Sequence, residues 1–229
     1  MFSLYYDSRD KQVTCVNGSG RCPGNLDLDI LKQELPDGKG GVDQNRHRKS
    51  VHSITIPGAA RGWEEFYARH SSGIFSFAEL LEPAANLAQD GFPVAPITSV
   101  AWSNGVEQDI KKWHSSDDVL PMPLSIDGRG PLPGEIFKNA DMAKVLQSLG
   151  EHGATKGFYE SFPGQAIVDA VQKHGGYMTM DDLKEEYTQC TFPDSISVEY
   201  KGFRVHQIPP NGQGITGLMR LVDLLPDAV

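Results

Sequence analysis

A double proline followed by two glycines constrains the fold of this chain more than any other feature. It lies in the stretch Gln207–Gly214, which reads QIPPNGQG. The prolines end the preceding strand, because proline offers no backbone N–H to a sheet, and the glycines permit close approaches and backbone angles that other residues resist. We therefore predict a strand, an abrupt turn and then a helix that begins near Ile215.

The predicted helix carries its apolar side chains at the 3.6-residue period, so that they share one face. These side chains are Ile215, Leu218, Met219, Val222 and Leu225. Only four residues follow Leu225, so a cover for this face has to come from earlier in the chain or from a segment that the chain lacks. Whether residues 1–229 form a complete domain is therefore an open question at this point.

The apolar period switches to two near both ends of the chain, which predicts a β-hairpin at each end. The first pairs Phe2–Tyr6 with Gln12–Val16, and the second pairs residues 196–200 with residues 203–207 through a Lys-Gly turn. A hairpin alone is only marginally stable in water. The edge near residue 2 is therefore expected to have a neighbouring strand that this chain lacks.

The middle of the chain has the apolar period of helices. Residues 61–69 are predicted to form one, with Trp63, Phe66 and Tyr67 on its apolar side. Further helices are predicted over 141–149, over 164–174 and from Thr179 onward, with residues 93–105 as a weaker candidate. These elements predict an α/β (α+β) fold with a mainly helical middle, in which helices cover one face of a sheet.

Local signals predict how one of these helices begins and ends. Ser76 is expected to cap it in a capping box with Glu79, and Gly91 is expected to end it. Pro83 lies inside it and removes one backbone hydrogen bond. We therefore predict two short helices in place of one.

Charge argues against nucleic acid or an anionic membrane as a partner. The formal net charge is −9 and the only basic cluster is Arg46–Lys49, whereas a surface that binds polyanions needs an extended basic stripe. This cluster lies in the polar segment 36–50, which is predicted to be a mobile loop. No apolar run reaches the ~20 residues that a bilayer span needs. No signal peptide is visible either, so the compartment stays open, with the cytoplasm favoured.

Neither a disulfide framework nor a metal site is predicted. The cysteines Cys15, Cys22 and Cys190 lack CxxC spacing and are expected to be free and mostly buried. A bond between Cys15 and Cys22 is the less favoured alternative. His47 and His52 offer only two close ligands, whereas structural zinc needs four, so a solvated loop is the better interpretation of these histidines.

No side chain of the sequence is predicted to be catalytic. Asp181, Asp182, Glu185 and Glu186 fall in the first turns of a predicted helix, where capping and the helix dipole account for acids. The sequence contains no Gly-x-Ser-x-Gly elbow, and Cys190 has no evident histidine partner. The residues alone therefore indicate an α/β chain without a nucleophile and its activating base.

Arg21 is the one candidate binding residue. It follows the turn Gly18–Gly20, which lacks the Gly-Lys-Ser/Thr end of a phosphate-binding loop. If the turn holds Arg21 in place, its guanidinium could bind a ligand carboxylate through two hydrogen bonds. The alternative is a surface arginine without a ligand, and the residues alone favour it.

Six short stretches follow one another along almost the whole chain in an order that resembles a known family. They are Ile56–Trp63, Phe77–Val94, Gly157–Tyr159, Gly175–Leu183, Tyr200–Phe203 and Pro209–Gly214. Together they resemble the large-subunit part of the gamma-glutamyltransferase (glutathione hydrolase) family. The patterns PGxxxGW, EPAxxLAxxGFPV and GGxxTxxDL carry most of the resemblance.

The resemblance implies the fold and the chemistry of an N-terminal nucleophile hydrolase. Its fold would be a four-layer αββα sandwich, of which residues 1–229 would be an incomplete large-subunit portion. Its precursor would cut itself in two, and the new N-terminal threonine would attack a gamma-glutamyl or related amide without metal or organic cofactor. That threonine would lie beyond Val229, in a missing small-subunit portion, so the chain alone is expected to be inactive.

Two departures from the family pattern bear on the substrate. Many members carry Arg-Glu-x-Ala-Pro where this chain has Gly18–Pro23, and that arginine binds the α-carboxylate of the glutamyl group. Here Ser19 occupies the register of the arginine and Arg21 stands two residues later. Asn211 likewise begins an Asn-Gly-Gln-Gly stretch in place of Ser-Ser-Gly-Gly. The pattern resembles the glutathione hydrolase-like and acylase-type branch.

Two alternatives remain open at this point. One is a related amide acylase with a different acyl group. The other is a non-catalytic interaction protein, which binds its missing half or a homologue through the exposed sheet edge and the apolar helix face.

Overall fold

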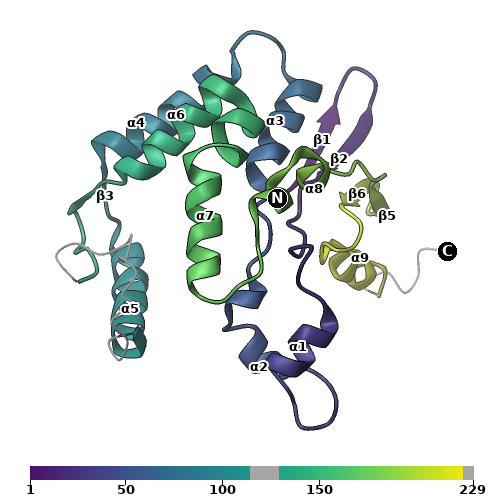
Figure 1. Ribbon diagram of the computed structural model, residues 1–229. Helices are drawn as coiled ribbons and strands as arrows, with labels where there is room; N and C mark the ends of the chain where they lie inside the picture. The colour runs from purple at the N-terminus through teal and green to yellow at the C-terminus, as the bar shows by residue number, and fades with distance from the viewer. Residues whose placement is uncertain (114–128, 224–229) are drawn as a thin grey trace. The chain divides into compact units, whose positions relative to one another are not determined.

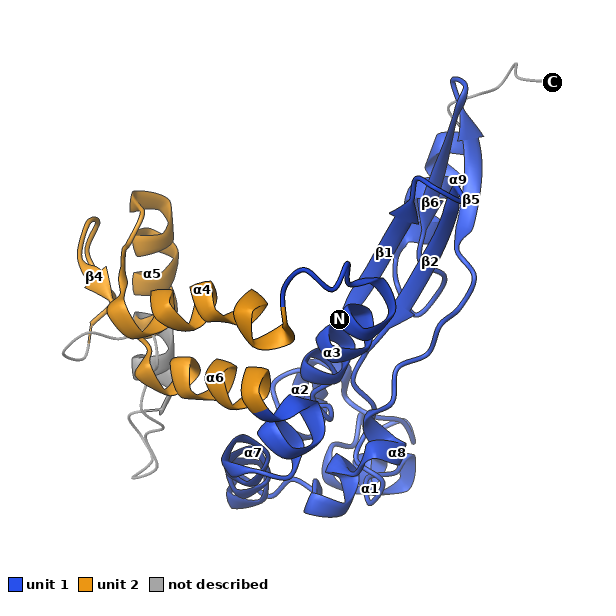
Figure 2. Ribbon diagram, turned by 90° about the horizontal axis from the view of Figure 1, so that it is seen from above, with its two compact units in different colours: residues 1–75, 152–229 blue, residues 76–151 orange. Residues whose placement is uncertain are grey.

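A computed structural model describes residues 1–113 and 129–223 of the chain (Figure 1). Two compact units are present, and Figure 2 distinguishes them by colour. The first comprises residues 1–75 and 152–229, and the second comprises residues 76–151. Leu225, which was predicted on the apolar face of the last helix, lies outside the described residues.

Both predicted hairpins are present in the first unit. β1 (Phe2–Asp7) pairs antiparallel with β2 (Gln12–Asn17), and β5 (Ile196–Tyr200) pairs antiparallel with β6 (Phe203–Gln207), each in register along its whole length (Figure 1). The described strands form three sheets of two strands each. The mixed fold with a helical middle and a hairpin at each end is thus confirmed, while the αββα layering stays an expectation for the family.

The first unit contains two helices of 12 residues, α3 and α7, and several shorter ones. They are α1 (Leu28–Glu34), α2 (Gln44–His47), α3 (Ala59–His70), α7 (Phe162–Lys173), α8 (Glu185–Thr188) and α9 (Gly214–Asp223), with 3-10 turns at Val51–Ser53 and Met180–Leu183 and a π-helical turn at Thr155–Tyr159. Val16, Tyr159, Met178 and Leu183 are all buried. The core of this unit therefore joins the end of β2 to the segment around residues 155–183.

The helix predicted from Thr179 onward is broken in the structure. A 3-10 turn ends at Leu183, Lys184 is extended with φ −63° and ψ 156°, and α8 then begins. The capping prediction is confirmed, because the Asp182 carboxylate accepts the Thr179 N–H at 2.8 Å. Asp182 also accepts the Gly24 N–H at 2.8 Å. This second contact binds the turn to a distant loop, which a continuous helix would not require.

The predicted apolar side of α3 is only partly buried, since Phe66 and Tyr67 are half-buried. The buried residues of this helix are Ala60, Arg61 and Gly62, whereas Trp63 is 42% exposed. Small residues at the start of α3 allow close approach: a Cβ on Gly62 would lie 2.7 Å from the sulfur of Met1. Close packing at the helix start therefore buries these three residues more fully than the aromatic side chains.

The segment 36–50 has more structure than a loop. Pro36 and Val42 form an isolated bridge, and Asp37 accepts backbone N–H groups from Lys39 and Gly41. The helix α2 then begins after Asp43. Its mobility stays a prediction.

The second unit contains two long helices, a two-stranded sheet and most of a third helix. They are α4 (Phe77–Asp90), β3 (Phe92–Pro93), α5 (Pro96–Trp113), β4 (Ile136–Phe137) and α6 (Ala140–Ala154), the last of which ends in the first unit. α5 and α6 extend the helices predicted over 93–105 and 141–149.

The helix α4 is continuous through Pro83, so the predicted split is wrong. Proline removes a single backbone hydrogen bond here, whereas the ends of the helix are well capped. The capping box of Ser76 with Glu79 is present, and Gly91 ends the helix with φ 93°, as predicted. Stable ends therefore outweigh one missing bond.

The helix α9 begins at Gly214, close to the predicted start. Of its apolar face, Leu218 is 7% exposed, whereas Met219 and Val222 are 63% and 53% exposed. The described part of the chain therefore leaves most of this face uncovered. Among the described helices, none is both long enough and apolar enough to cross a bilayer.

Candidate functional site

Arg21 lies on the surface just after β2, as its candidate role requires. Its side chain is exposed, and its Nη2 donates a long hydrogen bond of 3.5 Å to the backbone carbonyl of Gln189. Among residues 1–113 and 129–223, no carboxylate lies within ion-pair distance of it. The guanidinium therefore keeps donors that a ligand carboxylate can use.

The structure brings Ser19 and Asn211, which the sequence analysis singled out, into direct contact. Asn211 Nδ2 donates to Ser19 Oγ at 2.9 Å, and Asn17 Nδ2 donates to Asn211 Oδ1 at 3.0 Å. Asn17 Oδ1 in turn accepts the Ser19 N–H at 3.0 Å. We call Asn17, Ser19 and Asn211 the asparagine junction. It joins the turn after β6 to the loop that carries Arg21.

Backbone contacts fix the loop on which the junction lies. Asn17 exchanges two backbone hydrogen bonds with Thr191, at 2.8 and 2.9 Å, and Gly18 donates to the Met1 carbonyl at 2.9 Å. The loop also lies close against the entry to α3, since a Cβ on Gly58 would come within 2.2 Å of the Gly18 carbonyl oxygen. The turn before Arg21 is therefore held by its neighbours on several sides.

The donors and acceptors of this region suit recognition more than bond cleavage. The amide groups of the junction satisfy one another, and the Ser19 hydroxyl, which accepts from Asn211, keeps its own hydrogen to donate. Arg21 adds a positive charge two residues away. The region offers a guanidinium and a hydroxyl to an anionic group, without a base beside a nucleophile.

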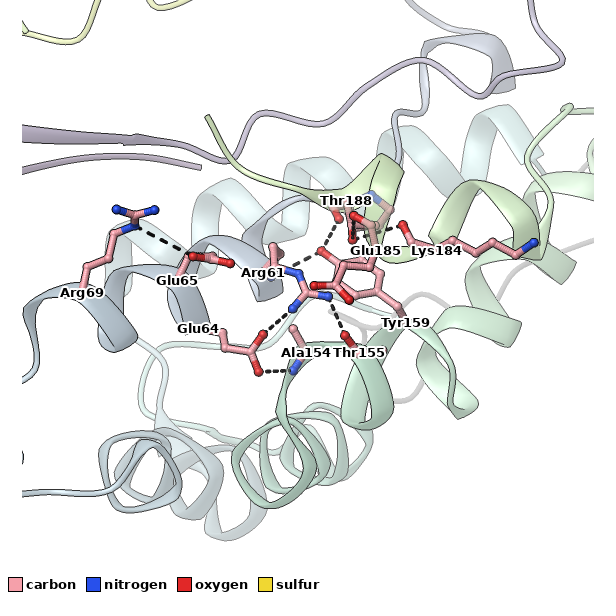
Figure 3. A network of polar contacts seen from close by, with 11 residues as sticks. Arg61, Glu64, Glu65, Arg69, Ala154, Thr155, Tyr159, Lys184, Glu185 and Thr188 are labelled. Atoms are coloured by element: carbon pink, nitrogen blue, oxygen red, sulfur yellow. Dashed lines mark hydrogen bonds and ion pairs between the residues drawn. The ribbon is translucent and has the colours of Figure 1, made fainter. Parts of the chain in front are cut away.

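A second polar network is buried, and sequence analysis did not predict it (Figure 3). The Arg61 guanidinium donates to Glu64 Oε2 and to Thr155 Oγ1, both at 2.6 Å. The other oxygen of Glu64 accepts the Ala154 N–H at 2.9 Å. Tyr159, which is 0% exposed, donates its hydroxyl to the carbonyl of Pro57 at 2.6 Å.

The buried network has the properties of a stabilising contact between two segments of the first unit. Both terminal nitrogens of the Arg61 guanidinium and the Tyr159 hydroxyl donate to protein acceptors, and the network joins α3 to the π-helical turn at Thr155–Tyr159. Burial raises the pKa of Tyr159 to about 12, so the phenol keeps its proton at neutral pH. Arg61 and Tyr159 belong to two different stretches of the six that resemble the family. Their presence in these stretches was the sequence signal that could have indicated that they lie close together.

The cysteines are free, as predicted, but Cys22 is exposed and not buried. Desolvation raises the thiol pKa of Cys15 and Cys190, and the partial desolvation of the Cys22 thiol, with the nearby charge of Asp182, raises its pKa as well. A raised pKa lowers the fraction of reactive thiolate at neutral pH. These thiols therefore lack the activation that a catalytic cysteine needs.

The interpretation of His52 as part of a solvated loop is wrong. Its side chain is 6% exposed and its Nε2 lies 2.7 Å from Glu34 Oε2. Tyr177 donates its hydroxyl to the other oxygen of Glu34. Across the described residues no group of three or more metal-binding side chains is found.

Comparison with known proteins places these features in a family context. The family model described as "Gamma-glutamyltranspeptidase" matches residues 1–228. The chain is 34% identical over 220 residues to the "Glutathione hydrolase-like YwrD proenzyme" of Bacillus subtilis, covering 96% of this chain and 38% of that protein. It is 26% identical over 219 residues to the "Acylase ACY 1 proenzyme" of a Pseudomonas species, covering 94% of this chain and 37% of that protein.

Solved structures of similar fold include an acylase and a transpeptidase. The cephalosporin acylase of Bacillus halodurans has a TM-score of 0.82 and 29% identity, covering all of this chain and 40% of its own. The gamma-glutamyltranspeptidase of Helicobacter pylori has a TM-score of 0.81 and 20% identity, covering 100% of this chain and 62% of its own. The chain thus spans less than two thirds of the relatives that it matches.

Proposed function

Because the chain belongs to the gamma-glutamyltranspeptidase family, we propose that it is the large-subunit part of an amide hydrolase. The observation that carries this proposal is the family match over residues 1–228, combined with a coverage of only 38% of a proenzyme relative. In the complete protein, an N-terminal threonine of a second subunit would attack the amide carbonyl, with its own α-amine as the base. No residue of this chain would form the covalent intermediate.

Arg21 is the residue proposed to bind the substrate. Its guanidinium would take the α-carboxylate of a gamma-glutamyl group through two charge-assisted hydrogen bonds. Its exposure and its single long bond to Gln189 support this role. The asparagine junction would hold the loop in place and offer the Ser19 hydroxyl beside it.

A related acylase is the second candidate, and a specific observation favours it. Ser19 is neutral in the register where the family pattern has an arginine. The likeness to two acylases is consistent with an acyl group that lacks part of the glutamyl head. The two candidates share the amide-cleaving reaction and differ in what Arg21 contacts.

The reaction itself is tested by the intact mass of the native protein under denaturing conditions. The proposal expects two fragments, one that contains this sequence and one that begins with threonine. A single species of 25.1 kDa would contradict it and would favour a non-catalytic interaction protein.

The identity of the acyl group is tested on the complete processed protein with three amides that share the same leaving group. Gamma-glutamyl, glutaryl and 4-aminobutanoyl amides carry both charged groups, only the carboxylate and only the ammonium, respectively. Arg21→Ala should raise KM at least about tenfold for the first two, the effect of losing about 1.4 kcal/mol of binding, and leave the third unchanged. Arg48→Ala, at another exposed arginine, serves as the control. An unchanged KM for the gamma-glutamyl amide would remove Arg21 from the site.

A further inference from the structure

The first unit contains a cavity that the proposed function does not use. Its volume is about 310 Å³, at the lower end of the range for small-molecule sites. Three segments line it: Val13–Cys15 of β2, Arg69 and His70 at the end of α3, and Phe192–Asp194 before β5. These segments are far apart in sequence, so the fold itself assembles the cavity.

Arg69 provides an oriented positive charge in the wall. Its guanidinium carbon lies 3.4 Å from the centroid of the Phe192 ring, so the aromatic ring covers one planar face. Its Nε lies 3.9 Å from Glu65 Oε2, which is an ion pair too long for a hydrogen bond (Figure 3). The stack fixes the guanidinium plane and leaves its N–H edges for another acceptor.

His70 and Thr14 form a second, neutral polar element of the wall. The His70 ring stacks on Tyr5 at 4.2 Å between centroids, and its Nε2 lies 3.1 Å from Thr14 Oγ1. Burial and the neighbouring Arg69 lower the pKa of His70, against an opposing effect of Asp7. At neutral pH the imidazole is therefore uncharged and serves as a hydrogen-bonding group in a fixed position.

Asp194 supplies a negative charge to the same cavity. Its side chain is exposed, and its carboxylate contributes, after burial, to the raised pKa of Cys15 in the opposite segment. The field of this carboxylate thus reaches the β2 wall. The remaining lining is largely apolar and comprises Val13, Cys15, Phe192 and Pro193.

We propose that this cavity binds a small α-amino acid in its zwitterionic form, with the carboxylate on Arg69 and the ammonium on Asp194. A ligand with one charge would pair only one of these two groups, whereas a zwitterion pairs both. An aliphatic side chain would lie against Val13 and the Phe192–Pro193 segment, which supplies apolar contact. This assignment goes beyond the proposed hydrolysis and uses neither Arg21 nor the asparagine junction.

Isothermal titration calorimetry of the purified protein with three matched probes tests the assignment. L-Leucine carries both charged groups, 4-methylpentanoate lacks the ammonium and L-leucinamide lacks the carboxylate. L-Leucine should bind, and each analogue should bind at least about tenfold more weakly, the factor that about 1.4 kcal/mol represents. Because the readout is binding and not hydrolysis, its failure would leave the proposed reaction untouched.

Two substitutions make the test specific. Arg69→Gln should weaken L-leucine at least about tenfold and leave the weak binding of L-leucinamide unchanged, and Asp194→Asn should weaken L-leucine while leaving 4-methylpentanoate unchanged. Arg48→Gln, at an exposed arginine outside the cavity, should change nothing, and circular dichroism checks that every variant is folded. Absence of L-leucine binding up to about 10 mM, or equal binding of 4-methylpentanoate, would overturn the proposal.

Discussion

Replacing Arg61 with methionine tests whether the buried network stabilises the first unit. Arg61 is 5% exposed, and its guanidinium donates to Glu64 and Thr155 at 2.6 Å each. Methionine retains an apolar stem but removes both donors. The Thr155 hydroxyl and one oxygen of Glu64 would then lose their partner inside the protein.

We expect this substitution to lower the free energy of unfolding by about 3 kcal/mol. Breaking a buried ion pair costs about 3–5 kcal/mol, and the lower end applies because the Glu64 side chain is 30% exposed and can regain water. In a chain of this size each 1 kcal/mol corresponds to about 2–4 °C in Tm. The Tm should therefore fall by about 6–12 °C.

Thermal and urea unfolding, followed by far-ultraviolet circular dichroism, measure the effect. The matched control is Arg69→Met on the same helix, where the side chain is 48% exposed and its ion pair with Glu65 is 3.9 Å long. This control should cost about 1 kcal/mol or less. Equal losses in the two variants, or a loss below about 1 kcal/mol for Arg61→Met, would refute the view that burial of the network gives it its strength.

Two further predictions concern local contacts. Asp182→Ala should lower the free energy of unfolding by about 2 kcal/mol in urea titrations, because Asp182 is 5% exposed and caps the Met180–Leu183 turn. Asp181→Ala, whose side chain is 79% exposed, should cost below about 0.5 kcal/mol, and an equal cost would contradict the cap. The hydrogen bond from the Arg9 side chain lowers the pKa of Asp7 from 3.8 to about 2, so its stabilisation is present above pH 3.8 and is lost as pH falls toward 2. Carboxyl NMR titration should show a higher Asp7 pKa in Arg9→Gln, still below the ordinary value because the backbone N–H of residue 9 continues to donate to Asp7, and an unchanged midpoint would exclude the Arg9 side chain as a cause.

Sequence reasoning succeeded where the structural cause is local. The capping box of Ser76 and Glu79 spans three residues, and the hairpins follow from a two-residue period, so short windows contain the full signal. The start of α9 follows in the same way from the double proline and the glycines before it. These elements form with little dependence on distant parts of the chain.

The failures arise where distant residues decide the outcome. The buried Arg61 donates to Thr155, which is 94 residues away in sequence, so no short window around Arg61 contains the information that it has a buried partner. Charge in a helix ordinarily indicates solvent, so the pattern favoured Trp63 as the buried residue. The contacts of His52 were missed for a similar reason, since Glu34 approaches it from a separate helix.

The candidate site joins Ser19 and Asn211, the two residues that the sequence analysis singled out in this region. Ser19 and Asn211 are 192 residues apart in sequence, yet one hydrogen bond of 2.9 Å joins them. A serine hydroxyl is short and accepts from the amide of Asn211, whereas an arginine in its place would bring only donors to that amide. The neutral residue at 19 and the amide at 211 therefore form one structural unit. Because residue 19 is neutral, Arg21 is the residue that supplies a positive charge to this loop.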